Sequence, residues 1–281
     1  EHAAQLVAFL RKIPRNATKR YPETMSLQKM SELEEKKKTP QWISAKTQHD
    51  HFGSISAILN FAVDEEWLAA NPLSNRTVVR RLPEIEHSAK PMMTAEEINL
   101  VLTNEKFVAE RANGARGQAR FWVPLLCLYH GMRSNEACQL LVADVKEEEG
   151  IAFLSLRPAD DEGKKVKSFK TKSSIRRIPL HDEIIKIGFL KFVESQRASG
   201  EEWLFPALTP NRLGSRADPL GKWFGRLRKE LIINLPNKTG AKSLHSFRHS
   251  FERSLRDNGV EDSIQFALGG WVDKRPRNSS V

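Results

Sequence analysis

A short polar segment bounded by two prolines, Pro83 to Pro91 (PEIEHSAKP), most constrains how this chain can fold. Proline lacks the backbone N–H that helices and sheets use, and the residues between the two prolines show no apolar periodicity. We therefore expect residues 83–91 to be a linker between an N-terminal domain over residues 1–82 and a C-terminal domain over residues 92–281. A length of 281 residues also fits two domains better than one.

The N-terminal domain is expected to be helical. In Ala45–Val63, apolar residues such as Ile55, Ile58 and Leu59 recur at helical spacing, and Asn71-Pro72 ends the pattern. Further helices are expected over Glu1–Lys12 and Ser26–Lys38.

The C-terminal domain is expected to mix helices with strands. Thr94 and Glu97 have the spacing of a capping box, which opens a helix over Ala95–Leu102. Other helices are expected over Phe121–Tyr129, Ser134–Leu141, Ile184–Val193, Pro219–Leu231 and Leu244–Leu255. Strands are expected over Ile151–Leu156, Val166–Phe169 and Ile175–Leu180, the last two paired across Thr171–Ser174. The predicted fold class is α+β and mainly helical, with a small three-stranded antiparallel sheet.

The net charge narrows the class of partner. Lys and Arg number 45 against 35 Asp and Glu, which gives a formal charge of +10 and a pI near 9.6. This excess favours a polyanion, either a nucleic acid or an anionic membrane surface. The longest apolar stretch, Phe121–Tyr129, is far shorter than the ~20 residues of a membrane span, so we expect no membrane partner. Two cysteines support neither a disulfide framework nor a zinc site, so we expect a cytoplasmic protein.

The strongest local charge signal is a run of cations without an acidic residue among them. It consists of Lys164, Lys165, Lys167, Lys170, Lys172, Arg176 and Arg177. Such a run can be an ordinary solvated face. Because it is one-signed and falls on a predicted hairpin, we favour a surface that contacts DNA phosphates.

Two short motifs place charged groups beside apolar helices. Arg133 and Glu136 are three residues apart at a predicted helix start, so the carboxylate can hold the guanidinium in one orientation. His245 and Arg248 have the same spacing on a later helix. Each motif alone is also consistent with a structural ion pair or an ordinary basic helix. The chain has no phosphate-binding loop and no zinc motif, and we expect neither a metal nor a cofactor.

The order of these pieces is more specific than any one of them. Along the chain come Gly131-Met132-Arg133-Ser134-Asn135-Glu136, Lys170-Thr171, Arg177-Ile178-Pro179-Leu180, Leu244-His245-Ser246-Phe247-Arg248-His249 and Leu268-Gly269-Gly270-Trp271. In this order they resemble the tyrosine recombinases of the phage integrase family. The resemblance implies that residues 92–281 form a catalytic domain and residues 1–82 a helical core-binding domain, which together clamp duplex DNA.

The resemblance also implies a role for each residue of the site. Arg133 and Arg248 match the two arginines that hold the reacting phosphate, since bidentate guanidiniums suit its oxygens. Lys170 matches the general acid, with Lys172 as the alternative. His245 matches a histidine that assists proton transfer, Trp271 matches a phosphate-contacting position, and Glu136 matches an acidic residue that supports the site.

The nucleophile is where the sequence departs from the family pattern. The family uses a tyrosine about nine or more residues beyond the position of Trp271, whereas this sequence has only Tyr21 and Tyr129. We therefore expect the nucleophile beyond Val281, in a catalytic domain that is incomplete at its C-terminal end. The alternative is a degenerate relative that binds DNA as a regulator without cutting it. A metal-dependent nuclease lacks the acidic cluster that two ions would need.

The resemblance implies partners as well. We expect double-stranded DNA, a homotetramer on two DNA sites, and accessory DNA-bending proteins in a nucleoid-associated complex that integrates or excises a mobile element. Whether an arm-binding domain precedes Glu1 is left open.

Overall fold

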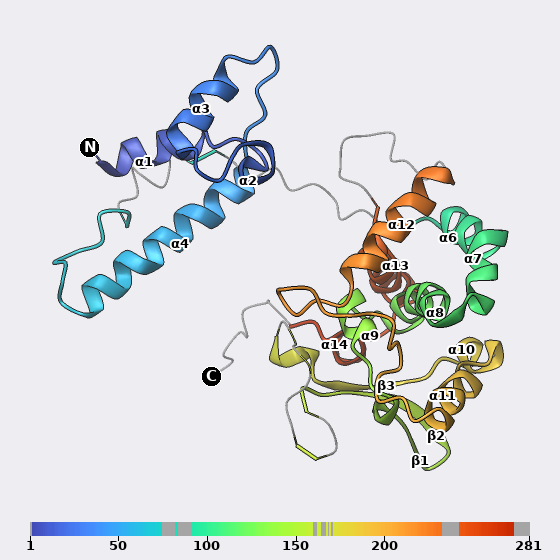
Figure 1. Cartoon of the computed structure of the whole chain (residues 1–281). Coiled ribbons are helices and arrows are strands. Elements are labelled where there is room, and N and C mark those ends of the chain that lie inside the picture. The colour runs from blue at the N-terminus through green and yellow to red at the C-terminus, as the bar shows by residue number, and fades with distance from the viewer. Residues whose placement is uncertain are drawn as a thin grey trace. The chain divides into compact units, whose positions relative to one another are not determined.

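The computed structural model divides into two compact units, Glu1–Ser88 and Ala89–Val281 (Figure 1). It describes residues 2–74, 82–83, 92–159, 162–163, 167, 169, 171–231 and 242–272. The division falls within residues 83–91, the expected linker, of which all but Pro83 lie outside the described residues. Within these ranges no helix is both long and apolar enough to cross a lipid bilayer.

The N-terminal unit is helical in its described part. Its helices are α1 (His2–Leu10), α2 (Ala17–Arg20), α3 (Leu27–Glu35) and α4 (Ala45–Asp64). Ser26 and Ser44 begin α3 and α4, because each hydroxyl accepts a hydrogen bond from a backbone N–H of the first turn. Val7 and Leu10 of α1 pack with Phe52 of α4 in a small apolar core.

Glu34 of α3 is a fully buried carboxylate that ties this unit together. It accepts hydrogen bonds from the Lys37 ammonium at 2.8 Å, the Arg20 guanidinium at 2.8 Å, the Tyr21 hydroxyl and the Gln41 backbone N–H at 2.8 Å. Burial alone would raise the pKa of Glu34, but these donors together hold it well below its ordinary value of 4.5. The carboxylate is therefore charged in the folded unit.

Replacing Glu34 by Gln should weaken the N-terminal unit at neutral pH, because two cations lose the charge that binds them. A pKa lowered on folding contributes stability above about pH 4.5, and that contribution is lost as the pH falls below it. Hydrogen exchange of α3 amides should therefore be faster in Glu34→Gln at pH ~7, with the difference closing below pH ~4. Glu35→Gln, which removes an exposed pair with Lys12, is the matched control. Equal effects of the two variants would contradict the assignment.

The C-terminal unit contains most of the helices and the sheet. Its helices are α6 (Ala95–Leu102), α7 (Glu105–Ala109), α8 (Gly114–His130), α9 (Ser134–Cys138), α10 (Asp182–Ile187), α11 (Phe189–Ala198), α12 (Asp218–Glu230), α13 (Leu244–Asp257) and α14 (Asp262–Gly269). Its short 3-10 helices are η1 (Glu110–Ala112), η2 (Val142–Asp144) and η3 (Lys172–Ser174). The capping box of Thr94 and Glu97 opens α6 as predicted.

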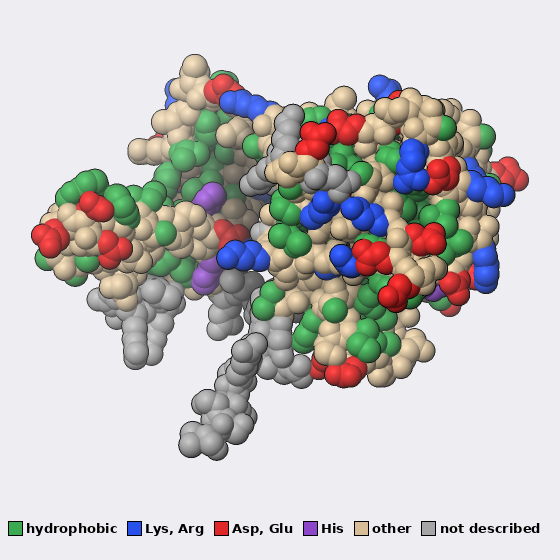
Figure 2. Space-filling view, turned by 90° about the horizontal axis from the view of Figure 1, so that it is seen from below, with side chains coloured by type: hydrophobic (Ala, Val, Ile, Leu, Met, Phe, Trp, Pro, Cys, Tyr) green, Lys and Arg blue, Asp and Glu red, His purple; other side chains and the backbone are tan. Residues whose placement is uncertain are grey.

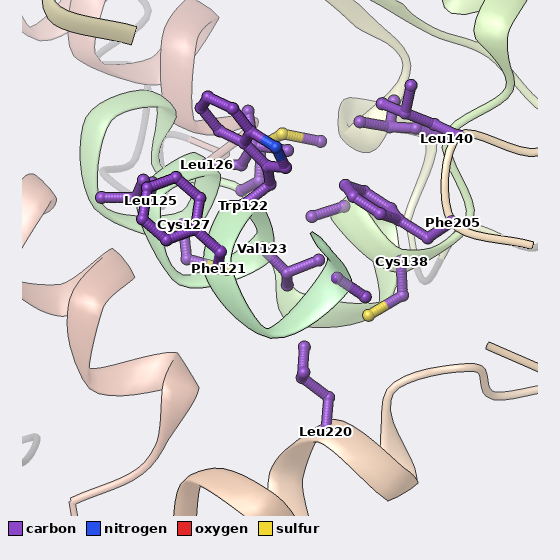
Figure 3. Close-up of a cluster of buried hydrophobic side chains, with 14 of the residues drawn as sticks. Phe121, Trp122, Val123, Leu125, Leu126, Cys127, Cys138, Leu140, Phe205 and Leu220 are labelled. Atoms are coloured by element: carbon purple, nitrogen blue, oxygen red, sulfur yellow. The ribbon is translucent and has the colours of Figure 1, made fainter. Parts of the chain in front are cut away.

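Helix α8 forms the centre of this unit. Its side chains are buried on nearly every side, including Trp122, Val123 and Leu126 (Figure 3). Because residues 121–127 of α8 are apolar and buried on all sides, other elements must enclose this part of the helix, and it packs extensively against α13. The C-terminal end of α8 and the face of α13 against it are thereby fixed relative to each other.

The sheet has three antiparallel strands in the order β1 (Val145–Glu148), β2 (Ile151–Leu156) and β3 (Arg176–Pro179), which confirms the predicted fold class. Leu154 of β2 lies opposite Val145 on one side and Ile178 on the other. The strand predicted over Val166–Phe169 is wrong, since its described residues Lys167 and Phe169 are not in a strand. The sheet instead contains the mainly polar strand β1, which the sequence did not predict.

Two helix boundaries also differ from the sequence prediction. The helix expected over Ser134–Leu141 ends at Cys138, and the one expected over Ile184–Val193 is broken at Gly188, whose φ of 101° favours glycine. Helix α14, which precedes Gly270-Trp271, was not predicted.

Candidate active site

Arg133 lies in the short connection between α8 and α9. It caps α9, and Glu136 one turn later accepts a hydrogen bond from its backbone N–H at 2.9 Å. The Arg133 guanidinium donates to Glu136 at 2.5 Å and to the Ser174 hydroxyl at 2.8 Å. Its side chain stays 24% exposed, so part of the guanidinium is available to a ligand.

Arg248 reaches the same place from α13. Its guanidinium donates to the backbone carbonyl of Gly131 and lies over the Trp271 ring, 4.8 Å from the centroid. Burial lowers the pKa of Arg248 to about 10, and the like charge of Arg133 acts in the same direction. A side chain at position 131 would collide with Phe251, whose ring lies 2.4 Å from the place of a Cβ atom. The close approach of α13 to the end of α8 therefore requires glycine there.

Glu136 is the carboxylate on which these cations converge. Burial would raise its pKa, but the guanidiniums of Arg176 and Arg133 outweigh burial and hold the pKa below its ordinary value. One carboxylate faces Arg133 and Arg176, with Arg248 close by, so the site keeps an excess of positive charge. Such a site is suited to a singly or doubly charged oxyanion.

Arg176 of β3 has a different place from the one predicted for it. Its side chain is only 6% exposed and donates to Glu136 at 3.1 Å, to the Leu268 carbonyl at 2.7 Å and to the Ser174 carbonyl at 2.9 Å. Its donors are committed to protein acceptors, so the structure places Arg176 inside the candidate site and not on the exposed basic surface expected for it. It holds Glu136 and the C-terminal end of α14 together.

Lys167 is also withdrawn from the predicted DNA surface. Its ammonium is buried and lies 2.6 Å from both carboxylate oxygens of Asp144. Burial raises the pKa of Asp144, while the charge of Lys167 opposes that rise. This pair fixes the chain three residues before Lys170.

The remaining cations of the basic run are exposed or outside the described residues. Arg177 pairs with Glu148 at the surface at 2.7 Å, and Lys172 is exposed in η3. Lys164, Lys165 and Lys170 lie outside the described residues. Thr171 directly follows Lys170, and its hydroxyl lies 3.0 Å from that of Ser174, which itself contacts Arg133.

Trp271 and His245 complete the predicted set. Gly270, with φ of 63°, ends α14, and its carbonyl accepts a hydrogen bond from the Ser173 hydroxyl at 3.1 Å. This turn directs the Trp271 ring to Arg248. His245 is exposed on the first turn of α13, one turn before Arg248, with its ring 4.5 Å from that of His249.

The structure thus brings Arg133, Glu136, Arg248 and Trp271 together from segments far apart in the sequence. Sequence reasoning missed Ser174, which carries no motif, and the supporting place of Arg176. A mainly helical domain with a small sheet, carrying one arginine before α9 and another within α13, is the arrangement that the resemblance to the tyrosine recombinases implies.

Comparison with known proteins agrees with this class. The model of the Phage integrase family matches residues 92–276. The chain is similar to the Tn1549 transposon integrase in complex with circular intermediate DNA, at 16% identity and a TM-score of 0.57, over 97% of this chain and 92% of that one. It is also similar to a variant of that integrase in complex with transposon right end DNA, at 17% identity and a TM-score of 0.55, over 96% of this chain and 91% of that one. At these identities the likeness shows the fold.

The chain therefore belongs to the phage integrase family, the tyrosine-type DNA recombinases. A search of curated proteins finds no match.

Removing Arg176 should destabilise the C-terminal unit far more than removing its neighbour. Arg176→Ala leaves the Glu136 carboxylate with one cation fewer in a buried place, which costs about 3–5 kcal/mol for a broken buried pair. Arg177→Ala breaks an exposed pair worth less than about 1 kcal/mol. Urea unfolding of the two variants measures the difference. An equal cost would show that Glu136 does not depend on Arg176.

Proposed function

We propose that this protein cuts and rejoins DNA at specific sites through a covalent 3′-phosphotyrosyl intermediate. The observation that carries the proposal is the convergence of Arg133 and Arg248 on one place, with Glu136 charged between them and Arg176. Family membership supports DNA strand transfer as the reaction class. Among the described residues no group of three metal-ligating side chains lies together. The mechanism proposed below uses no metal ion.

In the proposed reaction a tyrosine gives its phenolic proton to a base, for which we propose His245, and the tyrosine oxygen attacks the DNA phosphorus. A bond from that oxygen to phosphorus forms, the bond from phosphorus to the 5′ oxygen breaks, and the leaving oxygen takes a proton to become a hydroxyl. The two guanidiniums stabilise the negative charge that grows on the non-bridging oxygens. A 5′ hydroxyl of the partner strand then reverses these steps. Because the phosphodiester energy is kept in the covalent link, no nucleotide is consumed.

The tyrosine is proposed to follow Val281. Tyr21 lies in the N-terminal unit, where its hydroxyl donates to Glu34, and Tyr129 lies on α8 with its ring against His181. Neither side chain contacts Arg133 or Arg248 in the described hydrogen bonds and ring contacts. Residues 1–281 alone should then be unable to form the covalent link.

Lys170 is proposed as the general acid for the leaving oxygen, with Lys172 as the alternative. Support comes from the residues on both sides of it in the sequence. Lys167 is fixed by Asp144, and Thr171 and Ser174 are hydrogen-bonded beside Arg133. A lysine between two such anchors is favoured for a position that must be held close to the phosphate.

The wider assembly follows from the same proposal. Strand exchange between two duplexes needs four cleavage events, so we propose a homotetramer on two double-stranded DNA sites. The role would be integration or excision of a mobile element, on the nucleoid and with accessory DNA-bending proteins.

Alanine substitution of either arginine should abolish cleavage while leaving most duplex affinity, because each removes one transition-state contact among many backbone contacts. The test uses the protein continued through the first tyrosine after Val281, with a nicked duplex that traps the covalent complex. Arg133→Ala and Arg248→Ala should each lower the rate of trapping by on the order of 100-fold or more.

Arg197→Ala, which removes an exposed ion pair of α11, is the control and should trap DNA normally. Near-normal trapping by either site variant would contradict the proposed site. If the unaltered protein binds DNA but traps none, the protein is a DNA-binding regulator instead.

The general acid can be identified by a leaving group that needs no proton. Replacing the 5′-bridging oxygen by sulfur gives a thiolate, so loss of the acid no longer slows cleavage. Lys170→Ala should cut the normal substrate slowly and the sulfur substrate at nearly the unaltered rate. Lys172→Ala should respond equally to both substrates. The reverse pattern would assign the acid to Lys172.

A further inference from the structure

A second basic site lies in the C-terminal unit, away from the residues discussed so far. It is a cavity of about 320 Å³ between the N-terminal part of α8 and α12. Arg116 and Arg120 of α8 line it together with Lys222 and Arg226 of α12. Apolar side chains, among them Leu208 and Leu220, complete the lining. We call these four cations and their cavity the α8–α12 pocket.

The charges of this pocket are not balanced from within. No carboxylate lines it, and only Arg120 is held by one, since Glu110 accepts from its guanidinium at 3.0 Å. Within the described part of the chain, Arg116, Lys222 and Arg226 have no ion pair or hydrogen bond of the side chain. Three cations therefore face a common space without an anion.

The spacing of these cations is unfavourable for the helices themselves. Arg116 and Arg120 are four residues apart on α8, and Lys222 and Arg226 are four residues apart on α12. Like charges at this spacing lie on one face and destabilise a helix. Two such pairs that meet at one cavity indicate a place where an anion supplies the missing charge.

Figure 2 shows one face of the C-terminal unit, where Lys and Arg side chains lie among Asp and Glu side chains. The lining of the α8–α12 pocket contains four cations and no acidic side chain.

The position of the pocket suits a long polyanion that also occupies the active site. Arg133 follows the C-terminal end of α8, whereas Arg116 and Arg120 lie near its N-terminal end. At 1.5 Å per residue, the helix between them and His130 spans roughly 15–21 Å. A duplex that extends from the active site by this distance covers roughly four to six base pairs at 3.4 Å each.

We propose that the α8–α12 pocket binds a backbone phosphate of duplex DNA, several base pairs from the phosphate held by Arg133 and Arg248. This inference rests on the proposed function, because it assumes that a duplex occupies the active site. The three unpaired cations would neutralise the phosphate, and the apolar lining would contact its sugar. An acidic protein segment is the competing occupant, and the test separates the two.

The test compares a double variant, Lys222→Gln with Arg226→Gln, with a control that removes two exposed lysines outside the pocket. The control is Lys191→Gln with Lys229→Gln, on α11 and α12. Binding of a 30-base-pair duplex of arbitrary sequence is measured over a range of salt concentrations, because phosphate contacts do not depend on sequence. Loss of one phosphate contact should reduce the slope of log affinity against log salt by about 0.9.

We expect this reduction in the pocket variant and a smaller one or none in the control. Thermal stability of the pocket variant should not fall, because the substitutions relieve like-charge repulsion on α12. An unchanged salt slope in the pocket variant would overturn the proposal. Binding of a polyglutamate peptide that is lost in the pocket variant, with the duplex slope unchanged, would also overturn it and assign the pocket to an acidic protein segment.

The paired variant Arg133→Ala with Arg248→Ala, measured in the same way, separates failure of this inference from failure of the proposed function. If it reduces the slope and the pocket variant does not, only the pocket proposal fails. If neither variant reduces the slope, no phosphate is held at the active-site arginines, and the proposed function fails as well.

Discussion

The carboxylate of Glu136 is the interaction on which the rest of the candidate site depends. It accepts from the side chain and backbone of Arg133 and from the side chain of Arg176, so it joins α9 to β3. Arg176 in turn donates to the Leu268 carbonyl near the end of α14 and thereby links the turn that carries Trp271. Without a buried negative charge, guanidiniums this close would repel one another in a poorly solvated place. One carboxylate holds them and still leaves an excess of positive charge for an oxyanion.

The geometry of the candidate site also depends on the contact between α8 and α13. This contact sets the positions of both arginines. Arg133 follows the end of α8, and Arg248 of α13 donates a hydrogen bond to the Gly131 carbonyl. The helices can approach this closely only because Gly131 has no side chain to meet Phe251. The buried apolar part of α8 thus fixes the positions of Arg133 and of the Gly131 carbonyl at the end of the helix.

Much of the fold could be predicted from the sequence, because its signals are local: capping residues such as Thr94 indicate where a helix starts. The motifs around Arg133 and Arg248 each lie within one helical turn, and it was their order along the chain, through the family resemblance, that indicated the arginine pair. The places of Lys167 and Arg176 could not be predicted in this way. A cation in a basic run looks the same whether it faces solvent or a carboxylate, and the partners Asp144 and Glu136 are 23 and 40 residues away.

This difference changes what the basic run does. A one-signed stretch suggests a surface whose every charge meets DNA, but the structure divides its members. Lys167 and Arg176 use their charges inside the protein, where each binds a buried carboxylate and fixes the backbone beside it. Lys170 lies between them in the sequence, so these buried pairs fix the chain at Lys167 and at Arg176, on either side of the proposed general acid. Cations of a basic run can thus hold the protein's own backbone as well as attract a polyanion.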